Sequence, residues 1–353
     1  MEINKIRKSI DSIDKTIVEL LNKRAQQILN IGRLKNKSKQ AIYVPAREKE
    51  VLEHISRNNK GPIKTESLEA IYREVMSASL SLEKPLTIAY LGPKATFSNL
   101  AAIKKFGASV GYLACNTITD VFNEVEKDNA DYGVVPIENS IEGAISHTLD
   151  MLVDSDLKIC SQILLDISHN LLAKCLKKDI RRVYSNPQVF GQCRLWLETN
   201  LPKAELIDVS STTRAAQIAG KERNAACIAS LLAAKEYGLN LVAKDIEDCP
   251  HNITRFLVIG KYEAEPTGCD KTSIMFSIKD KVGALHDMLM PFKKYKINLT
   301  KIESRPSRKK AWDYFFFVDL LGHAHDKRIA NALKELEEKC KFMKTLGSYP
   351  QSE

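Results

Sequence analysis

The sequence has no long apolar run, no paired-cysteine motif and no glycine-rich phosphate loop, and each absence excludes a class of protein. No apolar stretch reaches the roughly 18 residues that a membrane-spanning helix needs. The eight cysteines are scattered from Cys115 to Cys340 without a CxxC pair, which argues against a structural zinc site and a disulfide framework. No dinucleotide motif, P-loop or HExxH is present, so we expect neither a cofactor nor a metal.

The composition is that of an ordinary soluble globular protein, with 44% apolar and 27% charged residues. A chain of 353 residues should hold two or three domains. The N-terminal segment is charged and amphipathic and has no apolar core of a secretory signal, so we predict a cytoplasmic location. The formal net charge of +9 is compatible with binding either nucleic acid or small polyanionic substrates, and it does not distinguish between these two kinds of ligand.

Three stretches of the chain differ in pattern. Residues 1–85 are predicted to be helical, with breaks at Pro45 and at Gly61-Pro62. From residue 86 short β-branched runs alternate with amphipathic helices, which is typical of α/β units with a largely parallel sheet. After a polar hinge at 262–271, the order β-α-β-β-α-β, including an expected strand WDYFFFVDL at 312–320, indicates a ferredoxin-like domain.

The first helix carries an apolar seam whose steps of three and four residues predict a partner helix; its members are Ile3, Ile6, Ile10, Ile13, Ile17 and Leu20. The same count places Arg24 in the seam, where an unpaired cation is costly, so we expect an anion to meet it. Lys35 lies on the same face about 16 Å further along the axis. The third helix repeats the spacing with Ser79 as its polar member and Glu83 one turn beyond. The alternative is a coiled-coil dimerisation arm with a few polar residues that set its register.

Segments from IRKSIDSID to YREVMSASLSLE resemble the all-helical chorismate mutase family across residues 1–85. The resemblance implies a three-helix domain in an intertwined dimer, with one substrate pocket lined by Arg24, Lys35, Arg47, Ser79 and Glu83. Arg7 lies about 100° around the helix from Arg24 and would enter the partner's site. Val44 stands where some relatives carry an acidic residue, so that contact with the substrate is expected to be missing or supplied by Glu48.

The implied reaction is the rearrangement of chorismate to prephenate, which needs no nucleophile or general base. The protein has to clamp two carboxylates and stabilise charge on the breaking ether oxygen. Arginines suit the clamp because a guanidinium meets a carboxylate bidentately, while Lys35 and Glu83 would flank the ether oxygen. An ionised carboxylate cannot donate a hydrogen bond, so Glu83 must be protonated, which requires a raised pKa.

Polar clusters follow the expected strands at four points in the middle of the chain: GPKATFS (92–98), VPIENSIEG (135–143), SNPQVFGQC (185–193) and SSTTRAA (210–216). A fifth cluster, HNITRF (251–256), leads into an expected strand. Any one of them is more typical of a helix cap than of a ligand site. Together they could face one anion-binding cleft between two α/β lobes.

The five clusters as a set resemble prephenate dehydratase across residues 86–262, which implies a two-lobed α/β domain. The resemblance implies that Thr254 is catalytic, together with Glu138, Asn139 and Gln192. The substrate-binding residues that it implies are Ser98, Ser185, Ser211, Thr212 and Arg255. The reaction releases carbon dioxide and water, and we interpret Thr254 as a hydrogen-bond donor to the departing hydroxyl. Glu138 or a water molecule is the rival general acid.

VGALHDML and IESRPS resemble the amino-acid-binding ACT domain, here over residues 270–353. The implied ligand is phenylalanine, an allosteric inhibitor, and the implied site consists of Gly283, Ala284, Leu285, Glu303, Ser304, Arg305 and Pro306. The alternative is a structural dimerisation domain.

The sequence therefore predicts a fused mutase, dehydratase and regulatory domain that forms a homodimer or a higher homo-oligomer. Its expected small-molecule partners are chorismate, prephenate and phenylalanine, with neither nucleic acid nor a membrane. One rival is a ligand-sensing transcription regulator, but a first helix of about 30 residues does not fit a helix-turn-helix. The other rival is a dehydratase whose helical N-terminal arm is catalytically inactive.

Overall fold

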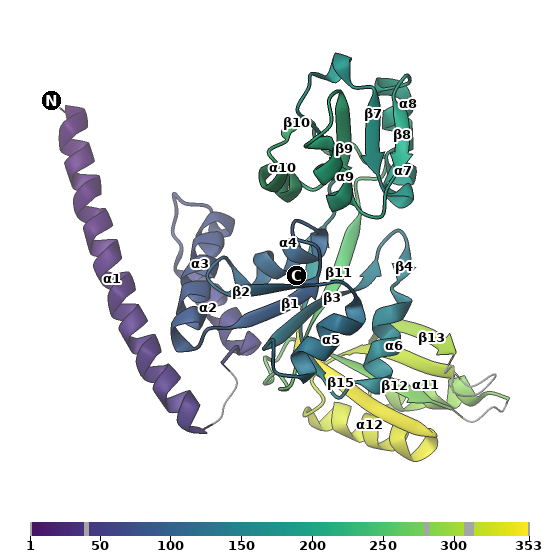
Figure 1. Ribbon diagram of the computed structural model, residues 1–353. Coiled ribbons are helices and arrows are strands. Elements are labelled where there is room, and N and C mark those ends of the chain that lie inside the picture. The colour runs from purple at the N-terminus through teal and green to yellow at the C-terminus, as the bar shows by residue number, and fades with distance from the viewer. Residues whose placement is uncertain (1, 39–41, 279–281, 307–313, 352–353) are drawn as a thin grey trace. The chain divides into compact units, whose positions relative to one another are not determined.

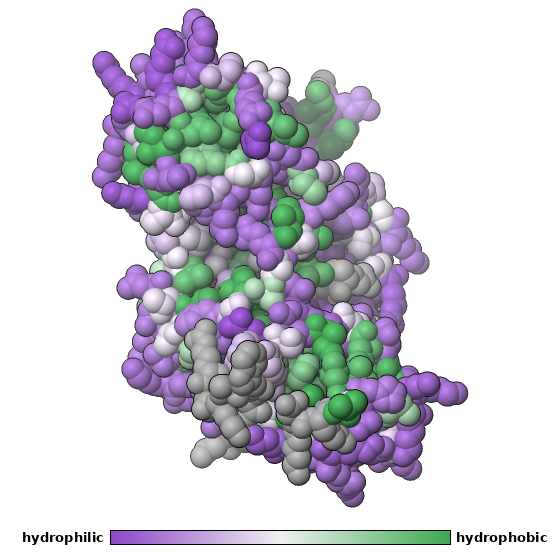
Figure 2. Space-filling view, turned by 90° about the vertical axis from the view of Figure 1, so that its right-hand side faces the viewer, coloured by the Kyte–Doolittle hydropathy of each residue, from purple (hydrophilic) through white to green (hydrophobic). Residues whose placement is uncertain are grey.

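A computed structural model of the protein describes residues 2–38, 42–278, 282–306 and 314–351 (Figure 1). The chain divides into two compact units, residues 1–87 with 105–111 and residues 88–104 with 112–353. None of the helices in the described ranges has the length and the apolar content that crossing a membrane requires. On the face seen in Figure 2, polar side chains alternate with separate apolar patches.

The first unit contains three helices, α1 (Glu2–Ser38), α2 (Pro45–Asn58) and α3 (Thr65–Glu83). Pro45 is the first residue of α2. Proline is favourable there because the first N–H groups of a helix have no partner within the helix. Lys84 ends α3 in an extended conformation, as expected for a residue that precedes a proline. The apolar seam of α1 is exposed in this chain, from 68% at Ile3 to 47% at Ile17. The partner helix that the seam predicts stays a prediction.

The segment 105–111 belongs to the first unit because it packs on α3. The backbone N–H of Ala108 donates to the Glu74 carboxylate at 3.0 Å, and that of Ser109 donates to the Ser77 hydroxyl at 3.0 Å. Gly107 has a φ of +71°, and a Cβ there would lie 2.5 Å from the Cβ of Ser77. Only glycine fits this close approach without strain.

The second unit begins with a sheet in the order β2-β1-β3-β11-β5, to which β4 adds on β3. Its strands are β1 (Thr87–Leu91), β2 (Gly111–Cys115), β3 (Tyr132–Asn139), β4 (Gly143–Ala144), β5 (Lys158–Asp166) and β11 (Ile253–Gly260). The accompanying helices are α4 (Phe97–Phe106), α5 (Ile118–Glu126) and α6 (Ser146–Asp154). β1 is parallel to β3, whereas β11 runs antiparallel to both β3 and β5.

A second sheet has the order β10-β6-β9-β7-β8. Its strands are β6 (Asn170–Ala173), β7 (Arg182–Ser185), β8 (Glu205–Asp208), β9 (Ala225–Ala229) and β10 (Asn240–Ala243). The helices of this region are η1 (Lys177–Asp179), α7 (Pro187–Gln192), α8 (Arg194–Asn200), α9 (Thr212–Ala219) and α10 (Leu231–Tyr237). β7 is parallel to β8 and β9, but β6 is antiparallel to β9 and β10.

The prediction of a largely parallel sheet is therefore wrong, because both sheets are mixed. The cause in the first sheet is β11, which enters between β3 and β5 only after the chain has completed the second sheet. Apolar patterning reports how deeply a strand is buried and carries no information on its direction.

The third sheet confirms the ferredoxin-like order β-α-β-β-α-β. Its elements are β12 (Asp270–Ser277), α11 (Ala284–Lys294), β13 (Leu299–Pro306), β14 (Tyr314–Leu321), α12 (Lys327–Lys339) and β15 (Phe342–Pro350), and the strand order is β13-β14-β12-β15. The start of the expected strand at 312–320, Trp312 and Asp313, lies outside the described residues. Ile274, Val318 and Ile329 belong to the core between this sheet and its helices.

The other face of the third sheet packs against the first sheet. Met275, Phe317 and Leu346 share one buried cluster with Ile159 and Leu257 of the first sheet. Gly347 permits this contact, since a Cβ at this position would collide with the backbone of Ile159. The first and third sheets therefore share a continuous core.

Candidate active sites

A cavity of about 370 Å³ in the first unit brings together most residues that the sequence singled out there. The predicted residues that line it are Arg24, Lys35, Arg47, Glu48, Ser79 and Glu83. Arg73 and Lys105 also line it, so five cationic side chains face two carboxylates. An excess of positive charge in a partly enclosed cavity favours an anionic ligand.

Two polar pairs stand inside this cavity. The Arg24 guanidinium donates to the Ser79 hydroxyl at 2.5 Å, and that hydroxyl donates to the Val75 carbonyl at 2.7 Å. The Lys35 ammonium lies 3.0 Å from the Glu83 carboxylate. Within the described residues no carboxylate forms an ion pair with Arg24, so its charge is available to an anion.

Glu48 is one of the two carboxylates that line the cavity. It accepts a hydrogen bond from the Tyr43 hydroxyl at 3.0 Å and pairs with Lys105 at 2.8 Å. The Arg47 side chain is 72% exposed and pairs with Glu50 at 2.7 Å. Such an exposed pair is worth roughly 0–1 kcal/mol, so a ligand carboxylate competes for Arg47 at little cost.

Arg7 does not line the cavity. It precedes Arg24 by 17 residues on α1, which corresponds to about 26 Å along the helix axis. Two lining residues, Arg73 and Lys105, were not predicted. The helical repeat could have identified Arg73, because counting back from Glu83 by three, four and three residues reaches it. No pattern in the sequence indicates Lys105, since it lies 22 residues beyond the third helix.

In the second unit, Thr254 of β11 stands opposite Asn139 of β3. The Asn139 amide donates to the Thr254 hydroxyl at 2.8 Å and to Asn252 at 2.7 Å. Its oxygen accepts the backbone N–H groups of Ile141 and Glu142, which fixes the orientation of the amide. The Thr254 oxygen is therefore an acceptor toward Asn139, and its own proton is directed elsewhere.

The same network continues to the second sheet. The Asn252 amide donates to the Gln192 carbonyl oxygen at 3.1 Å, and the Gln192 amide donates to the Glu142 carboxylate at 3.1 Å. The His169 ring nitrogen Nε2 lies 2.7 Å from the same Gln192 oxygen. Because that oxygen can only accept, Nε2 of His169 carries the proton. Nδ1 is then bare, and it is buried without a hydrogen-bond partner in the described part of the chain.

His169 is held in its neutral form, since burial lowers its pKa. Its ring packs edge-on to Phe97 at 5.8 Å, which brings the segment 92–98 to the cluster. Neither His169 nor Asn252 was predicted. Asn252 had a signal, because it precedes Thr254 by two residues and so lies on the same face of an extended chain.

The other predicted substrate-binding residues of this unit are placed as follows. The Ser211 hydroxyl caps α9 by accepting the backbone N–H of Arg214, and Thr212 is the first residue of that helix. The buried Ser185 hydroxyl donates to the Ile228 carbonyl at 3.2 Å. Ser98 is buried in the first turn of α4. No described contact joins these residues to the Thr254 network.

Glu138 and Arg255 are not brought to this network either. Each is adjacent to a network residue on its strand, and successive side chains of a strand point to opposite faces. The Glu138 carboxylate lies 2.8 Å from the Lys301 ammonium of β13 and 3.8 Å from Arg255. Arg255 pairs with Asp319 of β14 at 2.6 Å. The sequence placed these two residues at the substrate, whereas the structure places them against the third sheet.

The four predicted residues of β13 do not share one face. Glu303 and Arg305 are half-buried, while Ser304 and Pro306 are exposed. The Arg305 guanidinium contacts α6, donating to Ser146 at 2.7 Å and pairing with Asp150 at 3.1 Å.

The other predicted segment of this domain lies at the start of α11, where Gly283 adopts a φ of +76°. A residue with a Cβ is strained in this conformation, which explains the glycine. Ala284, the first residue of the helix, is buried, and Leu285 is half-buried.

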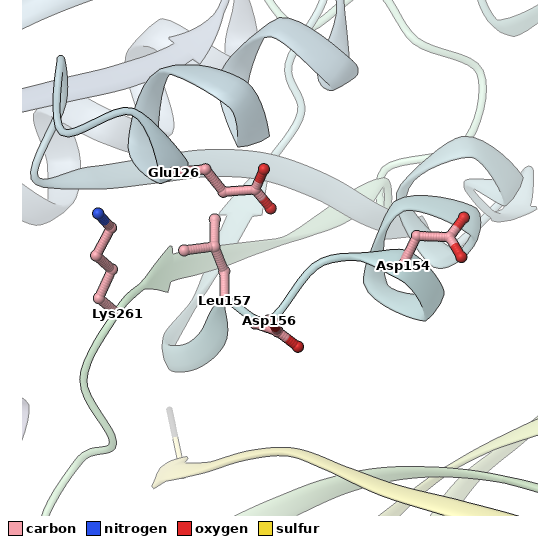
Figure 3. A pocket seen from close by; sticks show the side chains of 5 residues that line it. All are labelled: Glu126, Asp154, Asp156, Leu157 and Lys261. Carbon is pink, nitrogen blue, oxygen red and sulfur yellow. The ribbon is translucent and has the colours of Figure 1, made fainter.

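A second cavity of about 450 Å³ has a different character (Figure 3). Its lining residues are Glu126, Asp154, Asp156, Leu157 and Lys261. Three carboxylates against one ammonium disfavour an anionic ligand. No group of acidic, histidine and cysteine side chains suited to a metal ion occurs in the described ranges. This cavity is therefore not a candidate active site.

Comparisons with known protein families match three consecutive models to this chain. They are chorismate mutase type II over residues 6–84, prephenate dehydratase over residues 88–264 and the ACT domain over residues 272–338. A bifunctional chorismate mutase/prephenate dehydratase from Aquifex aeolicus is 52% identical over 99% of this chain and 98% of its own length.

Two solved structures match 75% of the chain with a TM-score of 0.70 each. One is the prephenate dehydratase of Arthrobacter aurescens in complex with L-Phe, which is 35% identical and 90% covered. The other, GqqA, is described as a novel type of quorum quenching acylase, and it is 25% identical and 98% covered. Because one fold carries both descriptions, the function has to be argued from the sites and from the relatives that match over the full length.

Proposed function

This chain belongs to the family of bifunctional chorismate mutase/prephenate dehydratases, and we propose that each of its two reactions uses one of the two sites described above. The chain rearranges chorismate to prephenate and converts prephenate to phenylpyruvate with loss of water and carbon dioxide. The observation that carries the assignment of sites is the separation of a cationic cavity in one unit from a hydroxyl and amide network in the other.

The cationic cavity of the first unit is the chorismate site. Arg24 and Arg47 clamp the two carboxylates, because guanidinium groups bind carboxylates bidentately. Lys35 and protonated Glu83, which are neighbours in the cavity, donate to the breaking ether oxygen. Ser79 holds Arg24 in place, and Glu48 lies at the mouth to meet the substrate hydroxyl.

We place Arg7 in the site of a partner subunit, within an intertwined dimer. Two observations support this: Arg7 is about 26 Å from Arg24 along α1, and the apolar seam of the same helix is exposed in the single chain. A second copy of α1 would cover that seam and carry its own Arg7 across.

The Thr254 network is the dehydratase site, and we propose that the two sheets beside it form two lobes. Thr254 donates a hydrogen bond to the departing hydroxyl of prephenate, as the orientation of Asn139 permits. The hydrogen bond between Asn252 and Gln192 fixes the orientation of their amide groups. Glu138 faces the third sheet, so a water molecule is the better candidate for the proton source. We keep Ser98, Ser185, Ser211 and Thr212 as proposed substrate-binding residues, although no described contact joins them to the Thr254 network.

One experiment tests both assignments with a single preparation. Chorismate consumption and phenylpyruvate formation from added prephenate are measured for the wild type, Arg24→Ala and Thr254→Val. We expect the first variant to lose only the mutase activity and the second to lose only the dehydratase activity. If Arg24→Ala consumes chorismate at the wild-type rate, the cavity is not the mutase site. If the wild type itself consumes none, the helical unit is only a dimerisation arm.

We propose further that the ACT domain binds phenylalanine and inhibits the dehydratase, and that the protein is cytoplasmic. The support for the ligand is the prephenate dehydratase from Arthrobacter aurescens, whose structure was solved in complex with L-Phe. The proposed contacts are the start of α11, at Gly283, Ala284 and Leu285, and the exposed residues Ser304 and Pro306 of β13. Unchanged dehydratase activity at saturating phenylalanine would contradict this regulation.

A further inference from the structure

Arg255 follows Thr254 on β11 and is buried on the opposite face of the strand. Its guanidinium donates to the Asp319 carboxylate at 2.6 Å and to the Tyr349 hydroxyl at 2.8 Å. The Ser273 hydroxyl joins the two partners, donating to Asp319 at 2.5 Å and lying 2.6 Å from the Tyr349 oxygen. Asp319, Tyr349 and Ser273 belong to three different strands of the ACT sheet.

The charges in this buried cluster balance through direct contact. Burial alone would lower the pKa of Arg255, but Tyr349 and Asp319 together raise it above its ordinary value, so the guanidinium stays charged. Burial raises the pKa of Tyr349, which keeps its hydroxyl protonated. Glu138 and Lys301 face the same cluster at its edge. A buried cation with two such partners cannot move without leaving charge unpaired.

The strand pairing at this point gives Arg255 a mechanical role. β11 pairs with β3 at Thr254 opposite Asn139 and at Arg255 opposite Glu138, but the register shifts immediately after Arg255. The next pair is Phe256 with Pro136, and a proline has no N–H to donate to the ladder. Irregularities of this kind occur beside active sites, where they direct a side chain. The ladder to β3 is therefore irregular directly after Arg255, while the pairing of β11 with β5 continues without a shift from Ile253 to Val258. The Arg255 side chain adds a third contact to the backbone at this point.

We propose that Arg255 is a positioning residue, which Asp319 and Tyr349 hold so that Thr254 keeps its place against Asn139. The cluster then connects the ACT sheet to the dehydratase site through a single peptide bond. A ligand that moves the ACT strands by a fraction of an ångström would displace Thr254 through this contact. This regulatory consequence rests on the proposed inhibition by phenylalanine, whereas the positioning role does not.

A second ion pair between the same two domains supplies a matched control. Arg305 of β13 pairs with Asp150 of α6 at 3.1 Å. Asp150 lies on a helix and not on β11 or β3, so its loss removes a contact between the domains without touching the strand that carries Thr254. The replacements Asp319→Asn and Asp150→Asn make the same chemical change at these two places.

The test compares these two variants of the full-length protein with the wild type. We expect Asp319→Asn to lower the dehydratase kcat by about tenfold or more while KM for prephenate changes by less than about twofold. Asp150→Asn should stay within about twofold of the wild type in both constants. Mutase activity and the thermal midpoint report whether the fold is intact. Tyr349→Phe is the milder second variant, with an expected loss in kcat of about threefold, and it decides the question if Asp319→Asn does not fold.

The proposal is overturned if the Asp319 and Asp150 variants have equal kcat values, whether both fall or both match the wild type. Phenylalanine is then added to each protein. We expect inhibition of the wild type and of Asp150→Asn, and an inhibition at least about fivefold weaker in Asp319→Asn. If phenylalanine does not inhibit the wild type, the proposed regulation fails, and the kcat comparison without phenylalanine still decides the role of Arg255.

Discussion

Replacing Thr254 by valine removes one hydroxyl and almost nothing else. Thr254 is 8% exposed, and valine has nearly the same shape, so the volume of the side chain is retained and only its polar atom is lost. The lost oxygen is the acceptor for the Asn139 amide at 2.8 Å. Asn139 keeps the hydrogen bond of one amide N–H, to Asn252 at 2.7 Å, while its other N–H loses its acceptor.

The expected effects on stability and on turnover differ in size. The loss of one neutral hydrogen bond costs about 1 kcal/mol of folding free energy. The loss of a donor that meets charge on a departing oxygen costs about 10²–10³ in kcat, or roughly 2.7–4 kcal/mol. If Thr254 acts as proposed, turnover therefore falls far more than the loss of stability accounts for.

The assay is phenylpyruvate formation from prephenate, with chorismate consumption measured in the same preparation as a control for folding. Thr254→Ser is the matched variant, since it keeps the hydroxyl and loses only a methyl group. We expect serine to retain turnover within about tenfold of the wild type and valine to lose it. Near-normal turnover by the valine protein would refute the assignment of Thr254 as the donor.

Three further predictions concern single residues of the two sites. Glu83→Gln should keep mutase activity, because the amide of glutamine donates a hydrogen bond to the ether oxygen; loss of mutase activity in the glutamine protein contradicts the role of Glu83 as a donor. Arg24→Ala should lower kcat/KM for chorismate by about 10²-fold or more, because an arginine that contacts a carboxylate is lost, while dehydratase activity stays unchanged. The pKa of His169 is lowered from 6.5 by burial, so the unfolded chain binds its proton at a higher pH than the folded one. Stability from this residue should thus be complete above pH 6.5 and decrease as the pH falls below it; a urea midpoint of His169→Gln with the same pH dependence as the wild type would contradict this.

The faces on which residues of the first unit lie were predictable, because side chains on an α-helix repeat about every 3.6 residues. Counting turns placed Arg24 and Lys35 on one face of the first helix, the family resemblance implied that Glu83 shares their pocket, and the cavity contains all three. A regular repeat maps sequence separation onto direction, so the sequence carries the geometry within and between neighbouring helices. Lys105 could not be found in this way, because it approaches α3 from a distant segment.

Residues on strands were harder to assign. Alternation along a strand shows that Glu138 and Asn139 face opposite sides, as do Thr254 and Arg255, but the sequence does not say which side holds the site. The answer depends on which sheet packs on which face, and here the third sheet covers the side of Glu138 and Arg255. The sequence also could not show that β11 runs antiparallel to β3, because an apolar run indicates that a strand is buried and not which way it runs.

The sequence by itself determined the three domains' order, the helical and ferredoxin-like patterns and the chemical types of the residues at both sites. These follow from local repeats and from short motifs, whose physics acts between near neighbours in the chain. The tertiary structure alone decided that Gln192 links His169 to Asn252 beside Thr254 and that Arg255 is anchored on the ACT sheet. Those contacts join residues 23 to 94 positions apart in the chain, and only the packing of the sheets brings them within hydrogen-bonding distance.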